Sequence, residues 1–236
     1  DVLQDDQFTE ANILLDTPTM VVHHKLYRKT FQPKYIISIE IEMEYLIDSV
    51  VKAEFQAKVE NMFAVEIFCV YVQKHMELKI NQEFMKGNTF GCRLSNYHLV
   101  FEFSGISTDL IHFALKVLEY MSSLKNSDNY QLNLIHNLKE RVINRYSEFE
   151  TMTSIKLATY YLNLLTDKLF IDYSTSDKFI HLRDKINSVG AATMASVVNE
   201  IGKHTRLNIL FVGNVEEIKA ISYSSRIKDL IISKFQ

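Results

Sequence analysis

The chain has 236 residues, 47% of them hydrophobic, and its 26 basic and 29 acidic side chains give a formal net charge of −3. This length and apolar content suffice for a sizeable core, in one large domain or two small ones. A surface so close to neutral argues against nucleic acid or another polyanion as a partner. With only six glycines and two prolines, the composition favours long helices and disfavours an all-β sandwich.

The N-terminal third predicts strands followed by a long helix. Residues 1–20 are polar and turn-like, and we expect them to be a lead-in linker to a single domain over residues 21–236. Residues 21–29 look extended. After Pro33, isoleucines at positions 37, 39 and 41 alternate with Ser38, Glu40 and Glu42, which is typical of a strand with one apolar and one polar face. Residues 48–80 lack Gly and Pro and repeat apolar residues in steps of three and four, which predicts one long helix or two in tandem.

The middle of the chain predicts a turn at Gly87 and Asn88, and then a hairpin of strands 89–94 and 97–103. Ser107, Thr108 and Asp109 are suited to begin the next helix. The apolar stripes of this helix and the two after it contain, in turn, Ile111, Leu115, Leu118 and Met121; Ile135, Leu138, Val142, Tyr146 and Phe149; and Leu157, Tyr161, Leu164 and Leu165.

The C-terminal part predicts a short helix at 176–182, a helix from about 188 to 201 that stops at Gly202, and a buried strand at 207–212. A last helix should run from Glu216 toward Phe235. Strands, a long helix, a hairpin, several helices, a strand and a helix form an α+β pattern, with helices packed on a mostly antiparallel, twisted sheet.

The chain lacks the motifs of a metal site, a serine nucleophile or a phosphate-binding loop. Neither His-x-x-Glu-His nor its inverse occurs, and His75 and Glu77 should point to different faces of a helix. We expect His75 to be a solvated residue near a helix end. His23 and His24 should point to opposite sides of a strand. No Gly-x-Ser-x-Gly, P-loop or Gly-x-Gly-x-x-Gly is present, and Gly87 and Gly91 are interpreted as turn and strand glycines.

Three further clusters have structural explanations. Glu40 and Glu42 share a strand face and should be solvated or paired with basic residues on a neighbouring strand. The basic side chains of Lys139, Arg141 and Arg145 should form the solvated face of their helix. Tyr160 and Tyr161 are expected in or beside the core. We therefore predict no catalytic, cofactor-binding or metal-binding residue in this chain.

Cysteine content and the chain's N-terminal stretch bear on location. Cys69 and Cys92 are the only cysteines, so we expect reduced, partly buried thiols and a cytoplasmic, reducing location. The N-terminal stretch is acidic and does not look like a signal peptide; it looks like a cut made inside a longer chain. The most apolar stretch, 62–72, is interrupted by Glu66 and is shorter than the ~20 apolar residues of a membrane span, so no membrane contact is expected.

Four segments in order resemble the middle, non-catalytic domain of the insulinase (pitrilysin-type) zinc metallopeptidases. They are Phe-Gln-Pro-Lys at 31–34, Tyr-His-Leu-Val-Phe-Glu-Phe-Ser-Gly-Ile-Ser-Thr-Asp-Leu at 97–110, Thr-Tyr-Tyr-Leu-Asn-Leu-Leu at 159–165, and Leu-Phe-Val-Gly-Asn-Val at 210–215. The likeness covers roughly residues 13–230. It implies a parent enzyme of four similar α+β domains around a chamber, with zinc held by the first domain and hydrolysis of peptides as its activity.

The same resemblance implies that this chain is a wall of that chamber, inactive on its own, with other domains of the same polypeptide and the parent's peptide substrates as partners. None of the family's zinc or catalytic residues has a counterpart here, and the helix expected at about 50–80 lacks the zinc motif. Two alternatives stay open: a stand-alone scaffold or assembly subunit of the same fold, and an unrelated α+β binding module.

Overall fold

The computed structural model describes residues 10–26, 35–42, 55–95, 98–106, 109–166, 172–201 and 206–235. Its strands are β1 (Asn12–Thr17), β2 (Met20–Leu26), β3 (Tyr35–Glu42), β4 (Thr89–Ser95), β5 (His98–Gly105) and β6 (Leu207–Gly213). Its helices are α2 (Phe55–Lys79), α3 (Asn81–Met85), α4 (Leu110–Ser123), α5 (Leu132–Ser147), α6 (Ser154–Thr166), α7 (Ser176–Ser188), α8 (Ala191–Ile201) and α9 (Glu217–Phe235), with short 3₁₀ helices at Ser127–Asn129 and Glu148–Thr151.

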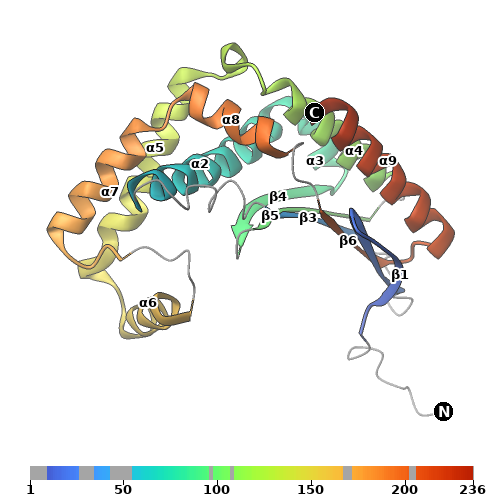
Figure 1. Ribbon diagram of the computed structural model, residues 1–236, viewed down its shortest axis with the longest axis horizontal. Helices are drawn as coiled ribbons and strands as arrows, with labels where there is room; N and C mark the ends of the chain where they lie inside the picture. The colour runs from blue at the N-terminus through green and yellow to red at the C-terminus, as the bar shows by residue number, and fades with distance from the viewer. Residues whose placement is uncertain are drawn as a thin grey trace.

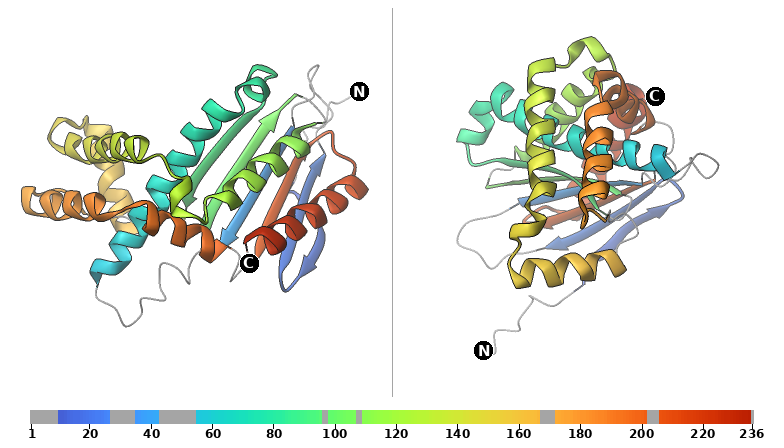
Figure 2. Two further views of the ribbon diagram at one scale, coloured as in Figure 1. Left: turned by 90° about the horizontal axis from the view of Figure 1, so that it is seen from above. Right: turned by 90° about the vertical axis from the view of Figure 1, so that its left-hand side faces the viewer.

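The described strands form a single six-stranded sheet in the order β1-β2-β6-β3-β5-β4. β2 and β6 run parallel, and every other neighbouring pair is antiparallel. Helices α2, α4, α5, α7, α8 and α9 gather on one side of this sheet (Figure 1), and the view from above shows α4 and α9 lying over the strands (Figure 2). The predicted α+β class, with a mostly antiparallel sheet, is confirmed.

Alternation along each strand separates a covered face from an open face. Ile37, Ile39 and Ile41 of β3 are at most 3% exposed and point into the helical layer, whereas Glu40 and Glu42 between and beyond them are half-buried on the other side. The same period of two holds in β6, which buries every second residue. The polar and apolar faces predicted for β3 are therefore confirmed.

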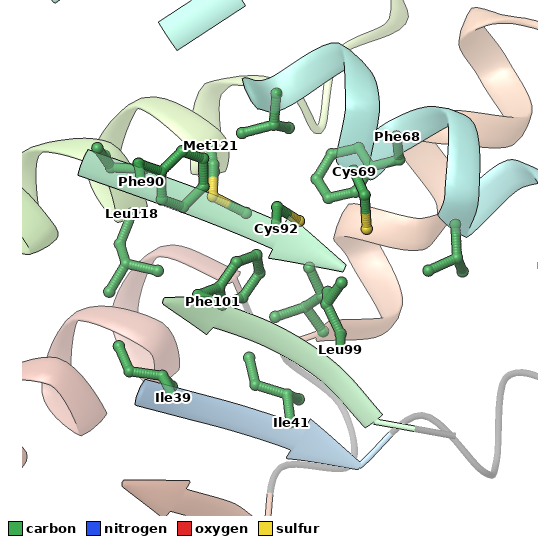
Figure 3. Packing of buried hydrophobic residues seen from close by; sticks show 14 of the residues in the cluster. Ile39, Ile41, Phe68, Cys69, Phe90, Cys92, Leu99, Phe101, Leu118 and Met121 are labelled. Carbon is green, nitrogen blue, oxygen red and sulfur yellow. The ribbon is translucent and has the colours of Figure 1, made fainter. Parts of the chain in front are cut away.

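Helix α2 is the centre of the helical layer. Its consecutive residues Phe63, Ala64 and Val65 are all buried, because β4 lies on one side of the helix and α5, α7 and α8 lie on the other. Figure 3 shows Cys69 of α2 and Cys92 of β4 with their sulfur atoms facing each other across this contact. Both thiols are free and buried, and burial, together with the neighbouring Cys69, raises the pKa of Cys92 well above its ordinary value.

The linker predicted for residues 1–20 is wrong from residue 12 onward, because Asn12–Thr17 forms the edge strand β1 and pairs antiparallel with β2. The Thr17 hydroxyl closes the connection: it donates to the Met20 carbonyl at 2.9 Å and accepts from the Met20 N–H at 3.0 Å. An edge strand with exposed residues on it tolerates the polar composition that suggests a linker. Residues 1–9 lie outside the described part.

Most other predicted elements are found close to the predicted bounds. The long helix is one helix over Phe55–Lys79 followed by the short α3, and the hairpin of β4 and β5 is confirmed. Gly87 lies at φ 85°, in the left-handed region that suits glycine, so the predicted turn is confirmed too. The predictions for residues 31–34, 48–54, 107–108 and Gly202 concern positions outside the described residues.

The apolar stripe predicted for α6 is buried only in part. Tyr161 and Leu165 are 49% and 85% exposed, Leu157 and Leu164 are half-buried, and Tyr160 alone among the described residues of α6 is buried. The helix lies apart from the others, toward the side of the sheet that they leave open (Figures 1 and 2). Tyr160 anchors it: its hydroxyl donates to Asp172 Oδ1 at 2.6 Å, and its ring contacts neighbouring aromatic rings.

Candidate functional site

The described residues contain no group of three or more His, Cys, Asp or Glu side chains that could hold a metal ion. His75 and Glu77 point away from each other on α2, as their spacing predicts: His75 is 2% exposed, whereas Glu77 is exposed and accepts from Lys74 Nζ at 2.7 Å. A zinc site built on this pair is therefore excluded by the geometry of the helix.

His75 is nevertheless not the solvated residue that we expect. Its ring stacks between Tyr71 and Tyr120, with centroid distances of 5.4 and 5.2 Å, and neither ring nitrogen has a hydrogen-bond partner in the described part of the chain. Burial, and to a smaller extent the charge of Lys79, lowers the pKa of His75 below its ordinary value of 6.5. Its position in the sequence does not reveal this burial, because Lys74, Glu77 and Leu78 in the same turns of α2 are exposed and only the side of the helix that faces Tyr120 is covered.

The histidine pair on β2 behaves as predicted. His24 is buried on the covered face and its Nε2 donates to the Val215 carbonyl at 2.7 Å, while His23 is half-buried on the open face. The two rings lie on opposite sides of the sheet, so they cannot share one ligand.

The basic cluster on α5 is only in part a solvated face. Arg145 donates to Glu66 Oε1 at 2.7 Å, and the adjacent Tyr146 hydroxyl donates to Glu66 Oε2 at 3.0 Å. Lys139 Nζ donates to the Asn187 carbonyl at 2.8 Å, joining α5 to α7. Burial raises the pKa of Glu66 more than Arg145 and Tyr146 lower it. These interactions join α5 to α2 and α7, and we assign these side chains no catalytic role.

A groove of about 510 Å³ crosses the open face of the sheet over β1, β2, β6 and β3. Val21 and Ser38, which are 7% and 9% exposed, form its floor. Its walls carry Asp16, His23, Glu40, Arg206 and Asn208. Glu40, one of the two carboxylates singled out in the sequence, is thus brought together with residues from both ends of the chain.

The cross-strand register explains this arrangement. Asp16 pairs with Val21, Val21 with Asn208, and Asn208 with Glu40, so these four residues form one row that spans four strands. A second row joins His23, Leu210 and Ser38. Side chains in one such row emerge on the same face of the sheet, and the groove therefore has a carboxylate at each end of its first row.

The polar side chains of the groove are not engaged with one another. Asp16, Glu40, Arg206 and Asn208 make no side-chain hydrogen bond or ion pair with any described residue, and neither does the Ser38 hydroxyl. On the same face, on the adjoining strands β5 and β4, Glu102 and Arg93 do pair, with NH2 to Oε1 at 3.0 Å. Of the two alternatives predicted for Glu40, a solvated side chain or one paired with a basic residue of a neighbouring strand, the described residues contain no such basic partner.

The alternation of Glu40 with isoleucines on β3 is the one local pattern that points to this groove. No local pattern marks Asp16 or Asn208 as members of the site. Their contribution depends on the parallel pairing of β2 with β6, two segments at opposite ends of the chain, and no local pattern specifies such pairing.

Comparisons with known proteins bear on the fold. No protein-family model matches the sequence, and no curated protein matches it. Among solved structures, the chain is similar to pitrilysin, with a TM-score of 0.71 and 14% identity over 95% of this chain. It is also similar to a conserved protein from Enterococcus faecalis V583, with a TM-score of 0.55 and 13% identity over 93% of this chain. The chain spans 22% of the pitrilysin chain and 52% of the other. At such identities the likeness shows a fold shared with part of each of these structures.

Proposed function

We propose that this chain is a non-catalytic domain of an insulinase-like zinc metalloendopeptidase and forms part of the wall of its substrate chamber. The observation that carries the proposal is the match of nearly the whole chain to about a fifth of pitrilysin. In this proposal the zinc ion and the catalytic residues belong to another domain of the same polypeptide, and peptide substrates pass along the surface that this domain presents.

The shape of the molecule supports the proposal. The described helices other than α6 cover one face of the sheet (Figure 1), and the opposite face has a groove whose Asp16, Glu40 and Asn208 side chains bind no other described residue. A wall that contacts many peptides needs such a surface, because hydrogen-bonding groups not bound to each other are available to a substrate backbone. The observed order of elements is also the order expected from the resemblance, which disfavours an unrelated binding module.

The test uses the purified 236-residue chain and the longest polypeptide that its gene encodes. We expect the chain alone to hold less than one equivalent of zinc by atomic emission and to leave a quenched fluorescent peptide uncut. The long polypeptide should cut the same peptide and lose this activity in a chelator. Chelator-sensitive hydrolysis by the rigorously purified chain would refute the non-catalytic assignment.

The long polypeptide also decides between the wall and a scaffold of the same fold. A gene that encodes His-x-x-Glu-His or its inverse upstream of this segment supports the wall. A gene that encodes no such motif, and a product without zinc-dependent peptidase activity, would replace the proposal with the scaffold.

A further inference from the structure

We propose that the open-face groove binds an extended peptide that crosses the strands and presents two basic side chains four residues apart. The inference rests on the proposed function for its biological setting and on the groove alone for its chemistry. The ligand is a short cationic peptide segment, bound by Asp16 at one end of the groove and by Glu40 at the other.

The spacing follows from sheet geometry. Asp16 and Glu40 stand at the two ends of one cross-strand row, three strand intervals apart. Neighbouring strands are ~4.8 Å apart, so the two carboxylates stand about 14 Å apart. An extended peptide rises ~3.3 Å per residue and alternates its side chains, so residues at positions i and i+4 share a face and span about 13 Å. Positions i and i+2 fall short, and positions i and i+3 point to opposite faces.

The character of the groove selects a peptide over other ligands. Two carboxylates this far apart cannot share one metal ion, and they repel the phosphates of a nucleic acid. Between them lie the apolar floor residue Val21 and the amide of Asn208, which can donate and accept with a peptide backbone. The Ser38 hydroxyl, on a side chain that is only 9% exposed, is directed into the same groove without a partner among the described residues.

The lack of a cationic partner for Asp16 and Glu40 among the described residues also favours a basic peptide. Elsewhere on the open face Glu102 is bound to Arg93, so a second cation has little to gain there. Asp16 and Glu40 are paired with no described cation. Arg206, also on the wall, carries a positive charge that opposes a cationic peptide. The groove therefore favours basic side chains at its ends, with Arg206 limiting the affinity.

The experiment measures fluorescence anisotropy of the 236-residue chain with three dye-labelled peptides. All consist of glycine, serine and alanine with two lysines, which are two, three or four residues apart. We expect the four-residue spacing to bind at least about threefold more tightly than the others and to weaken as salt is raised. Equal affinity for the three spacings, or tighter binding of a matching peptide with two glutamates, would overturn the inference.

Variants assign the effect to the groove. Asp16→Asn and Glu40→Gln should each weaken binding of the best peptide about threefold, as for single exposed charge pairs, and Arg206→Gln should strengthen it about twofold. Glu102→Gln is the matched control on the same face and should change nothing. Circular dichroism checks that each variant folds. If Glu102→Gln weakens binding as much as Glu40→Gln, the groove is not the site.

The outcome is separable from that of the proposed function. If the long polypeptide has zinc-dependent activity but the chain shows no preference for a lysine spacing, the proposed function stands and the peptide-binding inference fails. If the chain prefers one spacing but the gene product has no peptidase activity, the peptide-binding inference stands and the proposed function fails.

Discussion

Polar side chains on the two sides of the sheet differ in whether they have a hydrogen-bond partner. On the covered side, Glu66 is bound to Arg145 and Tyr146, and His24 is bound to the Val215 carbonyl. On the open side, Asp16 and Glu40 bind no other described residue. Burial makes an unpaired polar group costly, so the covered side pairs nearly all of them, whereas water can serve those of the open side. The covered face therefore contributes most to stability, and the open face leaves Asp16 and Glu40 without a partner among the described residues.

The largest expected effect contrasts two neighbours on β5. Phe101 is 0% exposed on the covered face, and Phe101→Ala should lower the free energy of unfolding by about 3–5 kcal/mol, because it removes buried surface and leaves a cavity. Glu102→Ala, on the open face, should change it by less than about 0.5 kcal/mol. Urea denaturation measures both. Similar losses at the two positions would contradict the division between the faces.

A smaller effect is expected for the paired polar group of the covered side. Tyr146→Phe removes the hydroxyl that donates to Glu66 and should cost about 1.5–3 kcal/mol, as for hydrogen bonds to charged groups. The exposed Tyr161, with no hydrogen bond of its hydroxyl to a described residue, provides the control: Tyr161→Phe should cost less than about 0.5 kcal/mol. Equal costs in chemical denaturation would show that the Glu66 contact contributes nothing.

His75 is an exception on the covered side, because it is buried and, like the Tyr130 hydroxyl, has no hydrogen-bond partner among the described residues. Burial lowers the pKa of His75 in the folded chain, so the unfolded chain binds the proton more tightly. Its contribution to stability should be complete above the ordinary pKa of 6.5 and be lost as the pH falls through and below 6.5. His75→Phe keeps a ring between Tyr71 and Tyr120 and cannot be protonated.

The measurement for His75 is thermal unfolding from pH 7.5 down to pH 5. The difference in stability between His75→Phe and the parent chain should grow in favour of the variant as the pH falls. Parallel curves for the two proteins would mean that His75 does not titrate differently in the folded and unfolded chains.

The smallest effect on stability is expected in the groove. Glu40→Gln and Asn208→Ala should each change the free energy of unfolding by less than about 0.5 kcal/mol, because neither side chain has a partner in the described part of the chain. Differential scanning calorimetry would detect a larger loss. Such a loss would indicate that these groups stabilise the fold, and it would weaken the contrast on which the groove depends.

Local patterns predicted much of the fold. Alternating isoleucines gave β3 and its two faces, the absence of Gly and Pro gave α2, and Gly87 gave the turn before the hairpin. Burial on individual helices was predicted less well. The stripe of α6 is periodic like that of α5, yet α5 buries most of its stripe and α6 exposes Tyr161 and Leu165. A hydrophobic period predicts a helix, but it does not specify whether a neighbour covers the apolar side.

Local patterns suffice to predict the class of fold, the two faces of β3 and the absence of the sought catalytic motifs, because these depend on residues within a few positions of each other. That β1 is an edge strand, that His75 is buried, and that Asp16 and Asn208 line a groove with Glu40 is seen only in the folded chain. These features depend on the pairing of β2 with β6 and on helix packing. Such contacts join segments from distant parts of the chain. Their register is set by the packing of the complete fold, and no periodic pattern within one segment specifies it.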